Sequence, residues 1–440
     1  MDLQVGRRLT GAEISDLLTE ARSRTLLLTG VLSDEDLRSQ HDPLMSPIVW
    51  DLGHIGHFED VWLVENVANG TTGSEGLRGI YNPFENPRAV RDELPLPSRS
   101  ECRGYLDAVR QRVLERLSAM DPEAGGPLLR DSFVYRMVLQ HEYQHNETIL
   151  QTLQLKRGDP YAAPRLGKPP AVAPDAPSPG AMVCFPGGSV ALGTNDRSIA
   201  YDNERPRHEV TLEAFWIDVH PVTNGQYLGF LEDGGYETRD HWSDAGWAWK
   251  QEAELIAPAY WLRREGGWLQ RCMDDEEALE PTRPVCHICY WEAEAYAAWA
   301  GKRLPSEAEW EAAASWDPAT GTKRLYPWGD EAPDREHANL DAELFRPVQV
   351  GSYPHGVSPI GCWGMIGDVW EWTSTEFRGY PGYETFPYPE YSEVFFGADH
   401  QVLRGGAWAT RFGAIRNTFR NWDYPIRRQI FSGVRCARND

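Results

Sequence analysis

Residues 137–154, MVLQHEYQHNETILQTLQ, carry the pattern that decides the fold of the first part of the chain. The stretch contains no Gly or Pro, and its apolar residues recur at mixed helical spacings: Met137, Val138, Leu150 and Leu153. This pattern predicts an amphipathic helix. In such a helix His141 and His145 lie on one face and can bind the same metal ion. Because pairs at this spacing also occur by chance, two buried, hydrogen-bonded histidines are the alternative.

The third metal ligand is not expected from the same helix. Two histidines and one carboxylate are a common Fe(II) site, and Glu147 is the nearby carboxylate. At about 100° per residue, however, Glu147 lies roughly 200° from His145 and roughly 240° from His141 around the helix axis. We therefore expect the remaining ligand from another part of the chain.

A second predicted helix, SPIVWDLGHIGHFEDVWLVENV at 46–67, contains two further histidines. Either His54 or His57 could supply the missing ligand. The alternative for each is a buried histidine bonded to a carboxylate, for which Asp51 and Glu59 are the candidates.

Four helices are predicted in the first 156 residues, over residues 11–40, 46–67, 98–120 and 137–154. Ser46 is a candidate N-cap of the second helix, with Pro47 at its first position. Four helices with these connections predict an up-down bundle whose metal site is built from facing side chains.

Length, composition and charge limit the possible functions. At 440 residues the chain favours two domains, and 18 Trp with 32 Pro favour irregular, aromatic-rich loops. A formal net charge of −23 disfavours nucleic acid and anionic membranes as partners, so an anionic substrate must meet a local arginine cluster. No apolar run approaches ~18 residues and the N-terminus lacks the apolar core of a secretion signal, so we expect a cytoplasmic protein.

The seven cysteines do not suggest a disulfide framework, because their number is odd and they are spread along the chain. Cys286 and Cys289 form the one close pair. Since no second C-x-x-C completes a zinc site, we expect ordinary buried thiols.

The texture of the chain changes after residue 156. Residues 157–181 are dense in Pro and Ala and predict a linker between a domain at 1–156 and a domain at 182–440. The later domain alternates short β-like runs with Gly, Pro and Trp, interrupted by one predicted helix over 286–314 that breaks at Pro305. We therefore expect an α+β protein of two domains.

The second domain resembles the formylglycine-generating-enzyme/sulfatase-modifying-factor domain, a variant of the C-type lectin fold. The matching stretches are FPGGSVALGT (185–194), DNERPRHEVTLEAFWIDVHPVTNGQY (202–227), WEAEAYAAWAGKRLPSEAEWEAAA (291–314), YPWGD (326–330), GCWGMIGDVWEWT (361–373) and VLRGGAW (402–408). Only Cys436 stands where formylglycine generators have a copper-binding cysteine pair, so that activity is not expected.

The first domain resembles a DinB-type four-helix bundle, which has one histidine on an early helix and H-x-x-x-H on a later one. A DinB bundle ahead of the lectin-like domain is the architecture of the ergothioneine-pathway sulfoxide synthases of the EgtB type. FRNWDYPIRRQIFSGVR (419–435) resembles the mycobacterial branch of that family.

The resemblance implies an oxidoreductase with a mononuclear non-haem Fe(II) held by His54, His141 and His145, which selects His54 over His57. The implied reaction uses O2 to join the imidazole C2 of hercynine to the sulfur of γ-glutamylcysteine and to oxidise that sulfur to a sulfoxide. Three neutral imidazoles leave open positions on octahedral iron.

The family also implies which residues bind the thiol substrate. Arg88 and Arg91 resemble its carboxylate clamp, together with Asp423 and Arg427. A substrate with two carboxylates and one ammonium group suits arginines and an aspartate. Without the resemblance, the two loop arginines would be interpreted as solvated side chains.

Hercynine contacts are implied for Gln144, Asn421 and Trp422, since a trimethylammonium group favours aromatic faces. Tyr388 and Tyr391 correspond to the family's tyrosine pair, with Tyr388 as the catalytic proton donor. Tyr380 and Tyr383 are the rival candidates for that role, and aromatic packing is the alternative for all four tyrosines.

Three questions stay open at this level. The thiol substrate could be cysteine instead of γ-glutamylcysteine, or a selenium or 5-histidylcysteine variant could apply. A non-catalytic metal- or thiol-binding sensor is the alternative from another functional class. We expect a monomer, and a structural cation in the second domain is undecided.

Overall fold

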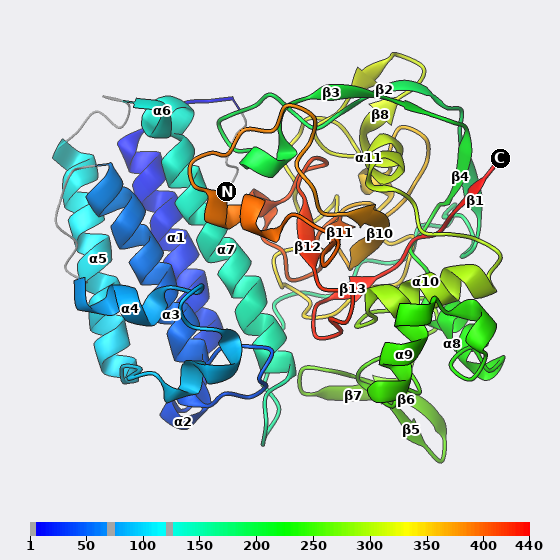
Figure 1. Cartoon of the computed structure of the whole chain (residues 1–440), viewed down its shortest axis with the longest axis horizontal. Helices are drawn as coiled ribbons and strands as arrows, with labels where there is room; N and C mark the ends of the chain where they lie inside the picture. Colours follow the sequence, from blue (N-terminus) through cyan, green and yellow to red (C-terminus); the bar gives the residue numbers. More distant parts are fainter. Residues whose placement is uncertain (1–5, 68–74, 120–125) are drawn as a thin grey trace. The chain divides into compact units, whose positions relative to one another are not determined.

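The computed structural model describes residues 6–67, 75–119 and 126–440. The chain divides into two compact units (Figure 1). The first ends at Pro164 and also includes Asp196–Ile199, and the second contains Arg165–Asn195 and Ala200–Asp440. The domain boundaries expected at residues 156 and 182 stay a prediction.

The first unit is built from four long helices: α1 (Gly11–Thr29), α3 (Ile48–Glu59), α5 (Arg99–Ala119) and α7 (Phe133–Gln154). Both α1 and α3 pack against α5 and α7. Short helices complete the unit: α2 (Asp34–Arg38), α4 (Arg78–Tyr81) and α6 (Gly126–Leu129). The four-helix bundle is therefore confirmed, although the stretch predicted as one helix over 11–40 forms α1 and α2, because α1 ends at Gly30 and Ser33 caps a new helix.

The start of α3 differs from the sequence prediction. The helix begins at Ile48, with Pro47 in the cap position and no side-chain capping bond. Ser46 is not the cap, because its Oγ instead accepts a hydrogen bond from Arg91 at 2.6 Å. A π-helix, η1 (Asp60–Asn66), continues directly from α3.

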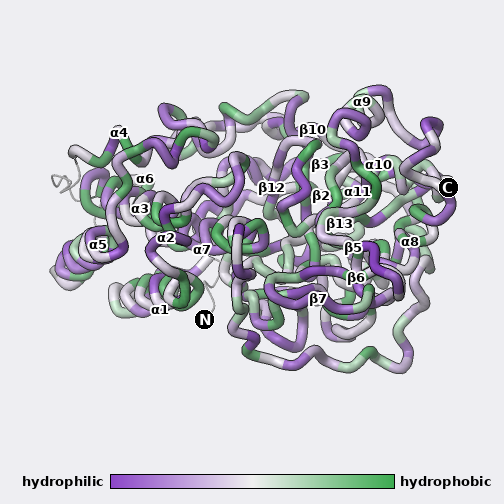
Figure 2. Tube along the Cα trace, turned by 90° about the horizontal axis from the view of Figure 1, so that it is seen from below, coloured by the Kyte–Doolittle hydropathy of each residue, from purple (hydrophilic) through white to green (hydrophobic). Residues whose placement is uncertain are grey.

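The second unit contains short strands in five small sheets. Their bounds are β1 (Met182–Phe185), β2 (Gly188–Leu192), β3 (His208–Leu212), β4 (Phe215–Asp218), β5 (Trp261–Arg264), β6 (Gly267–Cys272), β7 (Asp275–Ala278), β8 (Trp316–Asp317), β9 (Thr322–Lys323), β10 (Trp370–Glu376), β11 (Gln401–Arg404), β12 (Asn421–Asp423), β13 (Ser432–Gly433) and β14 (Ala437–Asn439). The sheet orders are β1-β4-β14, β12-β11-β10-β13, β2-β3, β5-β6-β7 and β8-β9. The β5–β6 hairpin is strongly hydrophilic near β5 (Figure 2), although its end residues Trp261 and Cys272 are buried.

Four helices accompany these sheets: α8 (Asn224–Glu232), α9 (Asp244–Glu252), α10 (Tyr290–Trp299) and α11 (Glu307–Ser315). The helix predicted over 286–314 is two helices: α10 ends at Trp299, before Gly301 with its positive φ, and Ser306 with Glu309 forms a capping box that begins α11 after Pro305. Trp310 of α11 is fully buried in the main apolar cluster with residues of β1, β2 and β4. The expected α+β class is confirmed.

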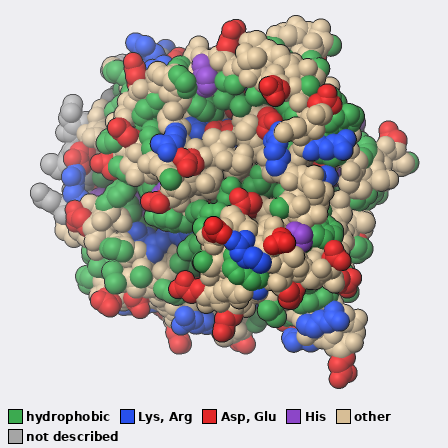
Figure 3. Space-filling view, turned by 45° about the vertical axis from the view of Figure 1, so that its right-hand side comes forward, with side chains coloured by type: hydrophobic (Ala, Val, Ile, Leu, Met, Phe, Trp, Pro, Cys, Tyr) green, Lys and Arg blue, Asp and Glu red, His purple; other side chains and the backbone are tan. Residues whose placement is uncertain are grey.

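Among the described residues, no helix is both long and apolar enough to cross a bilayer. On the face drawn in Figure 3, Asp and Glu side chains are dispersed among Lys and Arg instead of forming one acidic patch. The net charge is therefore spread over that face.

Candidate metal centre and active site

Three histidines of the first unit converge on one point. His54 of α3 and His141 and His145 of α7 each offer a ring nitrogen, and these atoms lie within 4.8 Å of one another. The Nε2 atoms of His54 and His141 are 3.2 Å apart. Both rings are 9% exposed. The structure thus brings together the three histidines that the sequence selected as ligands.

Neighbouring groups fix the first two imidazoles. His54 lies 2.9 Å through Nδ1 from the carbonyl oxygen of Tyr81 and stacks on Trp50 at 4.8 Å between ring centroids. His141 stacks on Phe58, with a centroid distance of 3.7 Å and an angle of 8° between the rings. Because Nδ1 of His54 bonds to a carbonyl, its Nε2 is left with the lone pair that a metal ion needs.

The third imidazole has a charged partner. The Nδ1 atom of His145 lies 3.1 Å from Oδ1 of Asp51 on α3. The sequence had suggested Asp51 as a partner of His54 or His57, and that alternative is wrong because its carboxylate faces a histidine on another helix. His57 does not belong to the histidine cluster.

The local electrostatics keep two of the clustered histidines uncharged. Burial, followed by the charge of neighbouring imidazoles, holds the pKa values of His54 and His141 well below their usual range. Both rings are therefore neutral near pH 7, and neutral imidazoles are ligands for divalent transition metals. Glu147 is not part of the cluster, as the helix geometry predicted.

The two candidate clamp arginines differ in their surroundings. Arg91, in the 3-10 helix η3 (Arg88–Glu93), is 4% exposed and donates from Nε to the carbonyl oxygen of Asn86 at 2.9 Å. Its guanidinium carbon lies 3.6 Å above the ring of Trp50, and burial lowers its pKa to about 10. Arg88 is half-buried and donates to the carbonyl oxygen of Leu44 at 3.2 Å.

Gln144 lies on α7 between the two α7 histidines and is half-buried. The other hercynine candidates, Asn421 and Trp422, lie in β12 at the edge of its four-stranded sheet. Trp422 stacks on Phe377 at 4.0 Å and meets Tyr391 edge-on at 5.7 Å. One face of the indole is therefore covered by the protein's own phenyl ring.

Asp423, the last residue of β12, pairs with Arg427. The Nε atom of Arg427 lies 3.1 Å from Oδ1 of Asp423, and Arg427 is 8% exposed. The structure therefore places two of the expected thiol-binding groups side by side, bonded to each other.

The four candidate tyrosines have different partners. Tyr388 and Tyr391 lie 6.4 Å apart between ring centroids. Tyr380 donates to Glu307 at 3.4 Å, and Tyr383 donates to Asp202 at 2.8 Å. Burial, with added repulsion from nearby groups, raises the pKa of Tyr388 well above its usual value, so its phenol stays protonated.

The segment that carries Tyr388 and Tyr391 is anchored by a distant aspartate that the sequence did not single out. Asp202, in the 3-10 helix η5 (Asp202–Glu204), is fully buried. Its Oδ2 accepts from the Tyr383 hydroxyl and from the Phe386 amide at 3.1 Å, and its Oδ1 accepts from Ser392 at 2.5 Å. These three bonds flank and fix the tyrosine segment.

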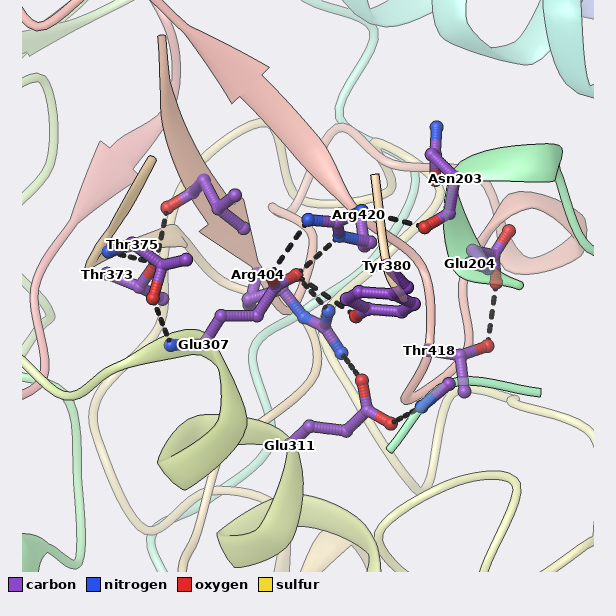
Figure 4. Close-up of polar contacts among 12 residues, drawn as sticks. Asn203, Glu204, Glu307, Glu311, Thr373, Thr375, Tyr380, Arg404, Thr418 and Arg420 are labelled. Atoms are coloured by element: carbon purple, nitrogen blue, oxygen red, sulfur yellow. Dashed lines mark hydrogen bonds and ion pairs between the residues drawn. The ribbon is translucent and has the colours of Figure 1, made fainter. Parts of the chain in front are cut away.

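A buried ion-pair network connects η5 to the residues before β12 (Figure 4). Glu307 accepts from Arg404 at 2.7 Å and from Nε of Arg420 at 2.6 Å. Arg420 also donates to the carbonyl oxygen of Asn203 at 2.7 Å, and Thr418 donates to Glu204 at 2.6 Å. The same three-residue helix therefore supports both the tyrosine segment and β12.

Comparison with known proteins follows the same division. Residues 17–149 match the DinB superfamily, and residues 168–440 match the sulfatase-modifying factor enzyme 1-like domain. Proteins named hercynine oxygenase match almost the full chain. The one from Mycolicibacterium thermoresistibile is 47% identical, over 97% of this chain and 94% of its own. The one from Mycobacterium tuberculosis is 47% identical, over 96% and 97%. The chain belongs to the hercynine oxygenase family.

Membership of the hercynine oxygenase family agrees with the fold, and the structure shows the state of the cysteine pair. The expected DinB-like bundle and sulfatase-modifying-factor-like domain are both confirmed. Cys286 and Cys289 are buried and free, as expected for ordinary thiols, and burial raises both pKa values well above the usual range.

In this member of the hercynine oxygenase family, the sequence interpretation missed Asp202 and gave Asp51 the wrong partner. Asp202 belongs to the DNERP stretch, which has the composition of an exposed turn although the structure buries it. Asp51 stands three residues before His54, so sequence spacing assigned it to the wrong histidine. In both cases the partner is distant in sequence, and no local pattern reports it.

Proposed function

We propose that the protein is an Fe(II)- and O2-dependent oxygenase that joins hercynine to γ-glutamylcysteine. The imidazole C2–H and the thiol S–H are lost, a C–S bond forms, and the sulfur becomes a sulfoxide. O2 accepts four electrons: one oxygen atom enters the sulfoxide, and the other leaves as water with the two hydrogens. The reaction is therefore balanced without a further reductant.

The observation that carries this proposal is the buried three-histidine cluster in a chain of the hercynine oxygenase family. Its donor set fits iron, because three neutral imidazoles bind a divalent transition metal and leave sites open for other ligands. When bound, Fe(II) would supply one-electron chemistry with O2. The protein itself would bury these imidazoles away from water, keep them neutral and hold their orientation.

The charged side chains proposed to line the site suit a thiol substrate that carries carboxylates. Arg88 is the more accessible arginine of η3, whereas Arg91 is already bonded by backbone and by Ser46. Asp423 and Arg427 are oppositely charged and adjacent, so they suit an amino acid's ammonium and carboxylate groups. In this proposal Arg88 makes the principal contact with the substrate carboxylate. Arg91 contributes to the same binding and also holds the loop through its bonds to Asn86 and Ser46.

Hercynine would be recognised without a hydrogen bond to its trimethylammonium group, which has no N–H. Trp422 and Tyr391, which meet edge-on, offer aromatic surfaces for that cation. Gln144 and Asn421 carry amides that can bond the carboxylate or the ring nitrogens.

Tyr388 is our candidate for the catalytic proton donor. Its raised pKa keeps the proton on the phenol until a strong base develops during O2 reduction. The hydroxyls of Tyr380 and Tyr383 donate to Glu307 and Asp202, respectively. These bonds favour a structural role over proton donation for both tyrosines.

The test is to load the anaerobic protein with Fe(II), admit O2 with hercynine and either thiol, and identify products by mass spectrometry. We expect a hercynyl γ-glutamylcysteine sulfoxide. A product made only from cysteine would overturn the thiol assignment, and bound iron without any C–S product would favour a sensor. Tyr388→Phe should reduce C–S product per O2 consumed, while Tyr380→Phe is the matched control.

A further inference from the structure

We propose that Asp51 is a positioning residue of the metal centre. It fixes His145 with Nε2 toward the ion and supplies a buried negative charge that the three histidines lack. The inference rests on the proposed metal site, but not on any particular substrate. It identifies a carboxylate next to the ligands, although no carboxylate belongs to the ligand cluster itself.

The geometry of Asp51 supports this assignment. The residue is 1% exposed, and its Oδ1 lies 3.1 Å from Nδ1 of His145. A carboxylate accepts hydrogen bonds, so Nδ1 of the imidazole is the donor. The lone pair of His145 is then on Nε2, and the ring cannot rotate without losing the bond. Asp51 thereby selects both the tautomer and the orientation of this ligand.

The three histidines are not equivalent in this respect. His54 bonds to the neutral carbonyl of Tyr81, and His141 is packed against the ring of Phe58. His145, in contrast, bonds to the carboxylate of Asp51. An imidazole that donates to a carboxylate is a stronger electron donor than one that donates to an amide. We therefore expect His145 to be the strongest of the three ligands.

The remaining oxygen of Asp51 points to the same conclusion. Its Oδ2 is buried and has no hydrogen-bond partner within the described residues. The charge of Arg91 interacts with Asp51, but its guanidinium is stacked over Trp50 and bonded to other groups, Ser46 among them. A buried carboxylate with an unsatisfied oxygen is unfavourable unless positive charge is near. A divalent ion at the histidines would provide that charge.

A matched control is available in the same unit. Asp60, the first residue of η1, is also fully buried and is paired with Arg112 at 2.9 Å. Asp60→Asn removes a buried negative charge from η1, which continues α3, and Asp60 is paired with Arg112, not with a histidine of the metal cluster. Comparison with Asp51→Asn separates a specific effect on the metal site from the general cost of losing a buried charge.

The experiment is a titration of the metal-free full-length protein with Co(II), read by its d–d absorption and by competition with a chelating dye. We expect Asp51→Asn to weaken binding about 10- to 100-fold, the range typical for partners of metal-bound histidines. The asparagine amide can donate to Nδ1, which favours the tautomer with a proton on Nε2. Asp60→Asn should bind Co(II) within about threefold of the unchanged protein.

Equal affinities of the unchanged protein and Asp51→Asn, or equal losses in the Asp51 and Asp60 variants, would overturn the inference alone. Failure of the unchanged protein to bind Co(II) would overturn the metal site and the proposed function with it. A measurement without variants covers the case in which Asp51→Asn does not fold. In a histidine-selective ¹⁵N spectrum of the Zn(II)-loaded protein, His145 must carry its proton on Nδ1, and a proton on Nε2 would refute the proposal.

Discussion

Replacement of Asp202 by alanine should release the segment that carries Tyr388 and Tyr391. The carboxylate of Asp202 accepts from the Tyr383 hydroxyl at 2.8 Å, the Phe386 amide at 3.1 Å and Ser392 at 2.5 Å. All three donors lie within ten residues of one another, and the acceptor belongs to η5, which is distant in sequence. One substitution therefore removes all three of these bonds.

The size of the effect follows from these contacts. Hydrogen bonds to a charged acceptor contribute roughly 1.5–3 kcal/mol each, so three bonds give roughly 4.5–9 kcal/mol. The loss is smaller here, because Ser392 keeps a bond from Asn203 at 3.0 Å and the half-buried Tyr383 can bond to water. We expect the free energy of local opening to fall by about 4 kcal/mol, or roughly a thousandfold in equilibrium constant.

Hydrogen exchange measures this quantity directly, because the Phe386 amide is itself one of the donors. Peptides covering residues 384–392 should exchange roughly a thousandfold faster in Asp202→Ala. Asp233→Ala is the control, since Asp233 accepts from Trp299 at 2.9 Å and does not contact this segment. An increase below tenfold in Asp202→Ala, or an equal increase in the control, would show that Asp202 does not anchor the segment.

Three further predictions test other parts of the structure. Arg91→Ala should lower the thermal midpoint more than Arg88→Ala, because Arg91 is 4% exposed and bonded to backbone; equal shifts would contradict this. Gly53→Ala should destabilise the protein by about 1–3 kcal/mol in urea unfolding, since a Cβ would lie 2.1 Å from the Tyr81 ring, whose residue also holds a metal-site imidazole through its carbonyl. It should also weaken Co(II) binding, and unchanged values of both would refute the packing argument. Burial lowers the pKa of His287 to about 3, so the unfolded chain binds a proton that the folded protein does not between about pH 6.5 and 3. The free energy of unfolding should therefore fall by about 1.4 kcal/mol for each unit that the pH is lowered through this window, and His287→Asn should remove that part of the fall; an equal change in the free energy of unfolding between pH 6 and pH 4 in His287→Asn and the unchanged protein, measured by urea titration, would refute it.

The interpretation of the second domain shows what local patterns can and cannot report. Pro305 and the Ser306–Glu309 capping box are adjacent in sequence, so the start of α11 was predictable, whereas α10 ends earlier than predicted, at Trp299. α8 and α9 were not predicted, because each is nine residues long and lies among turn-forming residues. Short helices depend on tertiary packing for their stability, and nine residues of sequence do not reveal which distant residues will pack against them.

The sequence by itself determined the bundle, the change of architecture after the first domain, and two of the histidines that converge, His141 and His145. These features follow from helical periodicity, from the i, i+4 spacing of His141 and His145, and from the angle that removed Glu147 from their face. They are local properties, so one stretch of chain is enough to fix them. The choice of His54 over His57 needed the family resemblance, and the structure then placed His54 in the cluster.

Only the tertiary structure decided which groups act on these histidines and on the tyrosine segment. Asp51 bonds to His145 across two helices, and Asp202 bonds to a segment about 180 residues later. Such pairings arise when packing removes both partners from water, because a buried carboxylate must then find donors wherever the fold brings them. Sequence spacing contains no record of those distances, and for this reason Asp51 was assigned to the wrong histidine and Asp202 was not recognised.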